Sequence, residues 1–60
     1  MKYIIYWDAG YGEEREVVEA TDVFEANKIA YETWKEAVES HADYGVEGES
    51  TEELKELYDL

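Results

Sequence analysis

The chain contains no cysteine and no proline, and only five of its 60 residues are lysine or arginine. The absence of cysteine excludes disulfide bonds and Cys/His catalytic pairs, and it suits a reducing cytoplasm. The longest apolar stretch without a charge covers only residues 3–7, far short of the roughly 20 residues of a membrane-spanning helix. The first residues also lack the basic and apolar regions of a secretory signal. We therefore expect a soluble, unanchored protein.

Acidic residues dominate what is present. Seventeen Asp and Glu residues give the chain a formal net charge of −12. A charge of this size repels nucleic acid and membrane phosphate and attracts basic surfaces. The composition is nevertheless 45% hydrophobic and 15% aromatic, whereas disordered chains contain few such residues. The sequence therefore predicts one folded domain over residues 1–60, of a size that buries only about 60% of the surface of the unfolded chain.

Two strands are predicted near the start of the chain. Residues 2–7 are rich in β-branched and aromatic residues, a composition typical of strands, and residues 14–20 are predicted as the return strand. The loop between them contains Gly10 and Gly12, and glycine can adopt the positive φ that hairpin loops require. Because this loop is longer than two residues, the register stays open by one residue, a shift that would exchange the two faces of the sheet.

A long helix is predicted next. Asp22 lies three residues before Glu25, the spacing of a capping box, and Thr21 is an equally suitable cap. The segment from this cap to about Ser40 or His41 contains no glycine or proline, and the helix is predicted to extend that far. An apolar stripe runs along this segment at helical spacing and consists of Val23, Ala26, Ala30, Trp34, Ala37 and His41, flanked by Phe24, Tyr31 and Val38.

The segments after the long helix predict a loop and a second helix. Gly45 suits a helix stop or a loop. Residues 50–53 repeat the capping-box pattern. They would begin a short C-terminal helix with an apolar face of Leu54, Leu57 and Tyr58. The predicted fold class is thus α+β: a β-hairpin packed on one long helix, followed by a short C-terminal helix (ββαα).

The first strand is apolar on both faces, with Ile4 and Tyr6 on one and Tyr3, Ile5 and Trp7 on the other. One helix covers one face, and Trp34 at the centre of its stripe should pack against the hairpin. The other face is left to water, to the C-terminal helix or to a second copy of the chain. Since an isolated hairpin is marginal and its edges are unpaired, we expect a homodimer through the sheet.

A row of carboxylates is the candidate binding site. With Ala30 at the centre of the stripe, five acidic residues project to the opposite side of the helix: Glu25, Glu32, Glu36, Glu39 and Asp43. Lys28 and Lys35 flank the row and can pair with Glu32 and Glu39. The second strand adds Glu13, Glu14, Glu16 and Glu19, of which Glu14 and Glu16 complete the predicted partner-binding set.

Such carboxylates can imitate a nucleic-acid backbone, which carries about one charge per 1.7 Å of duplex. The other interpretation is a merely solvated helix face. Ile29 lies among the carboxylates by the same projection. It is either covered by the second helix or an apolar anchor of the binding site.

Catalysis and metal binding are poorly supported. The one histidine, His41, can be combined only arbitrarily with Ser40 or Ser50, and paired carboxylates need a shielded cleft that so small a body lacks. Asp43, Glu47 and Glu49 lie in the predicted glycine-containing loop but do not match the spacing of an EF-hand. We expect no catalytic residue, no cofactor and no metal site, only weak cation condensation over residues 43–49.

Two segments resemble small acidic bacteriophage proteins: residues 18–26 with Ala30 and Trp34, and the sequence Ala42-Asp43-Tyr44-Gly45. The resemblance concerns local β-to-α packing and transfers no residue roles. It implies a phage-encoded protein acting in the cytoplasm of an infected bacterium, where small acidic chains often inhibit host enzymes that handle nucleic acid.

Charge and resemblance together predict a non-enzymatic inhibitor or adaptor that binds a basic surface of a host nucleic-acid-acting protein. Direct binding to nucleic acid or membranes is not expected, because phosphate is repelled. The alternative is a small self-associating structural or assembly protein whose charge serves solubility only.

Overall fold

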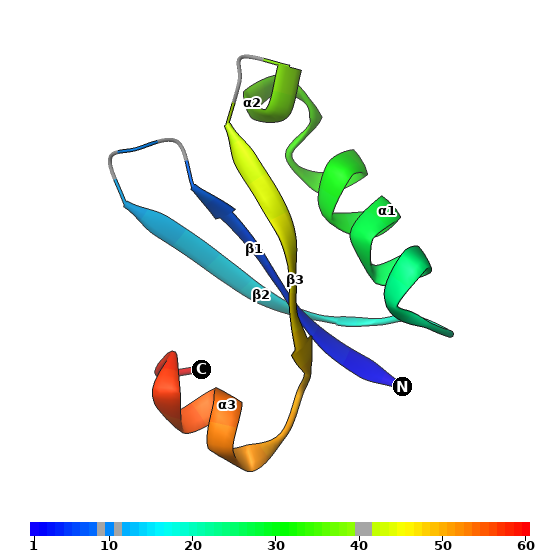
Figure 1. The fold of residues 1–60 in the computed structure, drawn as a ribbon, viewed down its shortest axis with the longest axis vertical. Coiled ribbons are helices and arrows are strands. Elements are labelled where there is room, and N and C mark those ends of the chain that lie inside the picture. Colours follow the sequence, from blue (N-terminus) through cyan, green and yellow to red (C-terminus); the bar gives the residue numbers. More distant parts are fainter. Residues whose placement is uncertain (9, 11, 40–41) are drawn as a thin grey trace.

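A three-stranded antiparallel sheet with helices forms an α+β fold (Figure 1). The structure is a computed structural model that describes residues 1–8, 10, 12–39 and 42–60, with the backbone alone for Val38. The sheet has the strand order β2-β1-β3. The elements are β1 (Lys2–Asp8), β2 (Glu13–Glu19), α1 (Val23–Thr33), α2 (Lys35–Glu39), β3 (Asp43–Glu49) and α3 (Glu52–Leu57). The predicted fold class, hairpin and short C-terminal helix are confirmed.

The hairpin adopts one uninterrupted register. β1 and β2 pair from Lys2 opposite Glu19 to Asp8 opposite Glu13, so that the return strand begins one residue earlier than predicted. In the loop, Gly10 has a φ of 91° and its N–H donates to Asp8 Oδ1 at 2.6 Å, while residues 9 and 11 lie outside the described residues. Since side chains alternate along a strand, this register directs one set of β1 residues toward α1: Tyr3, Ile5 and Trp7.

A third strand occupies the segment that the sequence predicted as a loop. β3 pairs antiparallel with β1, with Gly45 opposite Tyr6 and Val46 opposite Ile5. Glycine is rare in strands, and this hid the strand in the sequence. Glycine is nevertheless needed at position 45, because a Cβ at Gly45 would lie 2.8 Å from the Tyr6 Oη atom. Gly45 thus marks a close approach across the sheet.

The predicted long helix is divided into two. α1 ends at Thr33, Trp34 serves as its C-cap with φ −114° and ψ 31°, and α2 begins at Lys35. The Thr33 hydroxyl donates to the backbone carbonyl of Ile29 at 2.7 Å, a local bond that competes with regular helix geometry. Residues Ser40 and His41, where the helix was expected to end, lie outside the described residues.

Asp22, one of the two predicted caps, is the N-cap of α1. The Asp22 carboxylate accepts from the Glu25 N–H at 2.8 Å. The Glu25 carboxylate in turn accepts from the Thr21 N–H at 3.1 Å and from the Thr21 hydroxyl at 3.2 Å. At α3, the Thr51 hydroxyl accepts from the Leu54 N–H at 3.2 Å. Local sequence signals therefore fix the beginnings of both helices.

The core lies between the sheet and α1. α1 lies mainly over β1 and β3 and least over β2 (Figure 1). Trp34 stacks on Trp7 with ring centroids 6.4 Å apart and an interplanar angle of 21°, which confirms that Trp34 packs on the hairpin. Phe24, predicted to flank the apolar stripe, is 82% exposed. The buried residues of this core are Tyr3, Ile5, Ala20, Ala26 and Ala30.

The opposite face of the sheet is also occupied. Ile4 is fully buried but does not belong to the core beneath α1. Arg15, on the same face as Ile4, lies against the Tyr58 ring at the end of α3. The short C-terminal helix is therefore the observed neighbour of this face, one of the three covers that the sequence left open. Its Leu57 is 70% exposed and does not form the predicted apolar face.

Within the described residues, none of the helices has the length and apolar character needed to cross a membrane.

Candidate binding surface

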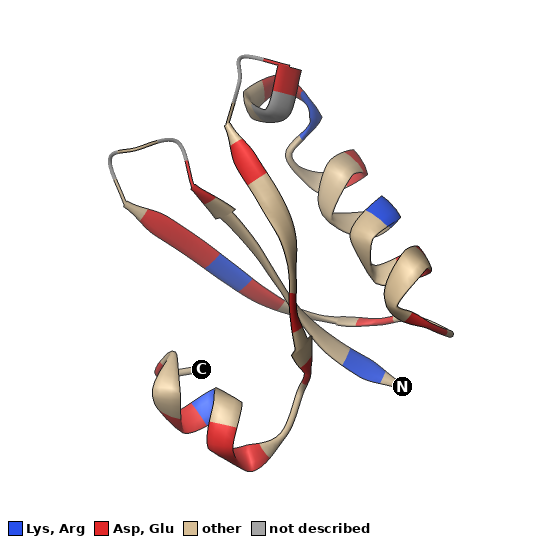
Figure 2. Ribbon diagram, in the orientation of Figure 1, with Lys and Arg blue, Asp and Glu red and all other residues tan. Residues whose placement is uncertain are grey.

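Negative charge covers the molecule rather than one face of it. Figure 2 shows acidic residues on every helix and strand. Of the lysine and arginine side chains, all of which the structure describes, three are exposed: Lys2, Lys28 and Lys35. Asp8 and Glu47 are the two half-buried acids. Fifteen of the seventeen carboxylates are exposed: Glu13, Glu14, Glu16, Glu19, Asp22, Glu25, Glu32, Glu36, Glu39, Asp43, Glu49, Glu52, Glu53, Glu56 and Asp59.

The predicted carboxylate row is not a single row. Glu25 and Glu32 lie on α1, Glu36 and Glu39 on α2, and Asp43 on β3. The prediction assumed one continuous helix, and the break at Trp34 separates its two halves. All five side chains are exposed, and they form separate acidic patches.

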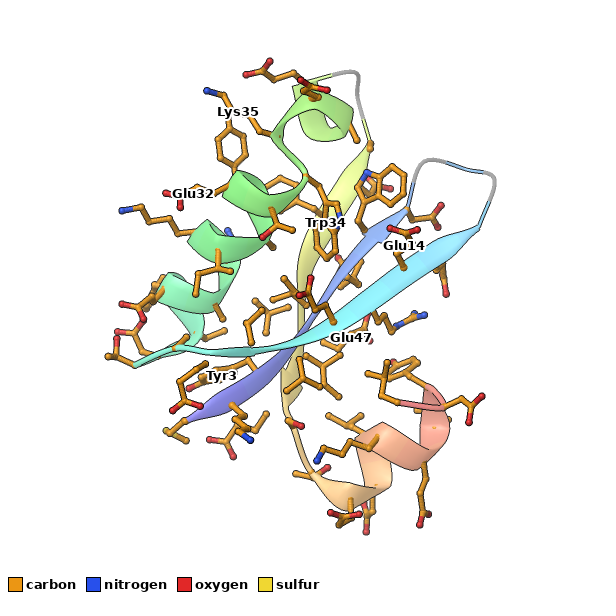
Figure 3. All side chains as sticks on the ribbon, turned by 180° about the vertical axis from the view of Figure 1, so that it is seen from behind. Tyr3, Glu14, Glu32, Trp34, Lys35 and Glu47 are labelled. Carbon is orange, nitrogen blue, oxygen red and sulfur yellow. The ribbon has the colours of Figure 1, made fainter. Side chains whose placement is uncertain are left out.

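Several of these carboxylates already have intramolecular partners. Glu25 belongs to the α1 cap. Glu32 lies 4.0 Å from Lys28, as predicted, and Glu39 accepts from the Tyr31 hydroxyl at 3.5 Å. Glu32 and Lys35 point away from the sheet (Figure 3). Exposed ion pairs of this kind contribute little stability, so they leave the negative field largely intact.

Ile29 was predicted on the acidic side, and this placement is wrong. Its side chain is half-buried and packs against the core beneath α1. The fully buried positions are Ala26 and Ala30. Ile29 follows Ala26 by three residues, about 60° around a helix, and therefore lies on the flank of the buried side. It is neither an exposed anchor nor covered by the C-terminal helix.

β2 carries the densest acidic segment. Four of its seven residues are glutamates, and all four are exposed: Glu13, Glu14, Glu16 and Glu19. Glu14 is opposite Trp7 and Glu16 is opposite Ile5, so both lie on the sheet face that carries α1. Because α1 lies mainly over β1 and β3, this part of the face stays open. Sequence reasoning identified both residues but not their place at the edge of the sheet.

A cluster around Arg15 fastens α3 to the sheet. The Arg15 Nη2 atom lies 2.8 Å from Glu13 Oε2 and 3.7 Å from Glu47 Oε1. Its guanidinium carbon lies 3.9 Å above the centre of the Tyr58 ring, and the Tyr58 hydroxyl donates to Glu47 Oε2. Sequence reasoning missed this cluster, although Arg15 is the only arginine and sits within an otherwise acidic strand.

The cluster also changes the interpretation of the predicted cation loop. Asp43, Glu47 and Glu49 belong to β3 instead of a loop, and Glu47 is engaged by Arg15 and Tyr58. Across the described part of the chain, no group of three or more His, Cys, Asp and Glu side chains is arranged to hold a metal ion.

Two pKa values respond to this cluster. The hydrogen bond to Glu47 raises the pKa of Tyr58, with burial and the Glu47 charge acting in the same direction and Arg15 opposing them. Burial lowers the pKa of Arg15, but the hydrogen bond to Glu13 and the charges of Glu13 and Glu47 outweigh it, so the pKa is raised. Arg15 therefore stays cationic, and Tyr58 keeps its proton at neutral pH.

The variant Tyr58→Phe should reveal the pH range in which this hydrogen bond stabilises the fold. Because the pKa of Tyr58 is raised above its ordinary 10.0 in the folded chain, the contribution is fully present below about pH 10 and is lost as the pH rises through the raised value. The difference in unfolding free energy between the two proteins should stay constant at about pH 7–9 and shrink above that. Urea titrations across this range measure it, and a difference independent of alkaline pH would contradict the assignment.

Comparison with protein-family models, curated proteins and solved structures finds no match to this chain.

Proposed function

We propose that the chain is a non-enzymatic acidic binding module that engages a basic surface of a nucleic-acid-acting protein, as a mimic of nucleic acid. The observation that supports this is the imbalance of fifteen exposed carboxylates against three exposed lysines. A field of one sign on so compact a body steers oppositely charged partners and rejects phosphate. The largest basic surfaces in a cell are those that bind nucleic acid, because they must neutralise a row of phosphates.

The distribution of the acids fits a mimic better than a single charged patch would. Acidic residues lie on α1, α2, β2 and β3 and not on one element alone (Figure 2), and the phosphates of a duplex are likewise spread around its body. The resemblance to small acidic phage proteins supports the same proposal. It makes the chain an inhibitor or adaptor in the cytoplasm of an infected bacterium, directed at a host protein.

Capture from a bacterial lysate at two salt concentrations tests this function. Retained proteins should be basic and nucleic-acid-acting, should elute when salt screens the exposed charges beyond about 8 Å, and should be displaced by added duplex DNA. The double variant Glu32→Lys, Glu36→Lys should slow association roughly 10-fold. The matched control Lys28→Glu, Lys35→Glu should quicken it, since it makes the same helices more acidic. Retention that resists both salt and DNA would overturn the proposal.

The alternative is a self-associating assembly protein, which the exposed Phe24 and Leu57 favour. The two interpretations respond to salt in opposite ways. Two copies bring −24 together (twice −12), so screening strengthens a homodimer and weakens binding to a basic partner. Sedimentation at low and high salt separates them, and a dimer that tightens with salt would favour assembly.

A further inference from the structure

One edge of the sheet is regular and has no strand beside it. In the described residues, the order β2-β1-β3 leaves the outer side of β2 without a strand neighbour. The β1–β2 ladder runs from Lys2 opposite Glu19 to Asp8 opposite Glu13 without a shift. In an antiparallel pair, alternate residues of an edge strand point their backbone N–H and C=O groups outward. Such an edge is a template for a further strand.

The other edge is less suitable. The β1–β3 ladder shifts register between Ile4 and Ile5, and β3 contains Gly45 and Gly48, the latter with a φ of 149°. Bulges and irregular backbone interrupt the row of outward groups and hinder pairing. Glu47 of β3 is moreover held by Arg15. The sheet therefore offers one regular edge, at β2.

The side chains of β2 select what can pair there. A symmetric antiparallel pair of β2 strands centred on Arg15 would place Glu14 opposite Glu16. Centred on Glu16, it would place Glu13 opposite Glu19. Like charges directly opposite each other destabilise a sheet, so both of these self-pairings are disfavoured, whereas a strand that carries cations at those positions is favoured. Arg15 does not relieve the contact between Glu14 and Glu16, because it is turned to the other face, where it is already paired with Glu13.

We propose that the β2 edge binds an extended basic segment of the partner, which adds to the sheet as a fourth strand. This inference rests on the proposed function and gives it a location. Glu14 and Glu16 lie on one face at the spacing of two residues, about 6.6 Å. Lysine or arginine at alternate positions of the added strand meets both carboxylates. Backbone hydrogen bonds supply affinity in this mode of recognition, and the alternating side chains supply specificity.

Three synthetic peptides test the backbone contribution. One peptide alternates lysine with threonine. The other two have the same sequence but carry N-methyl groups on one or the other set of alternate amides. Methylation keeps the charge and removes the backbone donors of that set. Binding is followed by NMR of the full chain. The unmodified peptide should bind and slow hydrogen exchange at alternate amides of β2. The N-methylated peptide in which the amides facing β2 are blocked should bind at least 10-fold more weakly than the unmodified peptide. The peptide methylated on the other set of amides should keep its binding.

A pair of isosteric variants tests the acidic contribution. Glu14→Gln with Glu16→Gln should weaken peptide binding roughly 2- to 30-fold, the combined effect of two cross-strand charge pairs. The control Glu53→Gln with Glu56→Gln removes the same charge from two exposed positions on α3 and should change peptide binding less than 2-fold. Circular dichroism of all variants verifies folding.

The outcomes separate the two proposals. Strand addition at β2 would be overturned if the unmodified peptide and both N-methylated peptides bound equally well. It would also be overturned if the two double variants lost the same amount of peptide affinity. The lysate capture would still decide the proposed function in that case. If capture also yields no basic, salt-sensitive partner, the proposed function falls with it.

Discussion

Replacing Ile5 with alanine is expected to lower the free energy of unfolding by about 2–5 kcal/mol. Ile5 is fully buried in the central strand and belongs to the core beneath α1. Alanine removes its packing and leaves a cavity that the flanking strands cannot close without breaking their ladders. A chain of this length has a total stability of only about 3–9 kcal/mol. The variant should therefore be largely unfolded at mild urea concentrations at which the parent protein is folded.

Urea titration with circular dichroism measures this loss. Leu57→Ala is the matched control, because it also truncates an aliphatic side chain but at a position that is 70% exposed. Its effect should stay within about 0.5 kcal/mol. An Ile5→Ala protein as stable as this control would show that the face of β1 toward α1 is not the core.

Trp34→Ala is expected to have the second largest effect, a loss of about 3 kcal/mol. This is the low end of the range for tryptophan deletions, because Trp34 is half-buried. The variant removes the stack on Trp7 and the side chain that seats the junction of α1 and α2 on the hairpin. Thermal and urea unfolding measure the loss.

A spectroscopic readout identifies its cause. Trp7 and Trp34 are the only tryptophans, so near-ultraviolet circular dichroism reports their stacking directly. Trp34→Phe retains an aromatic partner for Trp7 and should recover much of the stability while losing the Trp–Trp signal. Equal destabilisation by both substitutions would instead point to a requirement for the indole ring itself.

Elements with strong local signals could be predicted from the sequence. The β-branched and aromatic residues of β1, the Asp22–Glu25 cap and the capping pattern of residues 50–53 depend on neighbours within a few residues, and the structure shows the corresponding elements. The prediction missed features that depend on distant contacts. β3 is a strand because Gly45 fits beneath Tyr6, and no local propensity encodes that fit.

The same division applies to the candidate site. The excess of exposed acids was predictable, since charged side chains are rarely buried. The arrangement of those acids was not. The break after Thr33 is stabilised by a contact between Trp34 and Trp7, so a helical projection carried past that point placed Glu36, Glu39 and Asp43 on a row that does not exist. The Arg15 cluster likewise joins residues of three elements.

The central position of β1 has a consequence for how the chain folds. β1 is the first strand along the sequence, yet its pairing with β3 joins residues as far apart as Tyr3 and Glu49. The hairpin can close early, because its contacts are local, but closing the longer loop costs more chain entropy and comes later. Until β3 arrives, Ile5 and Tyr6 of β1 lack one strand neighbour, and a hairpin by itself is marginally stable. Folding should thus be all-or-none, and the acidic residues should take up their arrangement on the surface only when all three strands have paired.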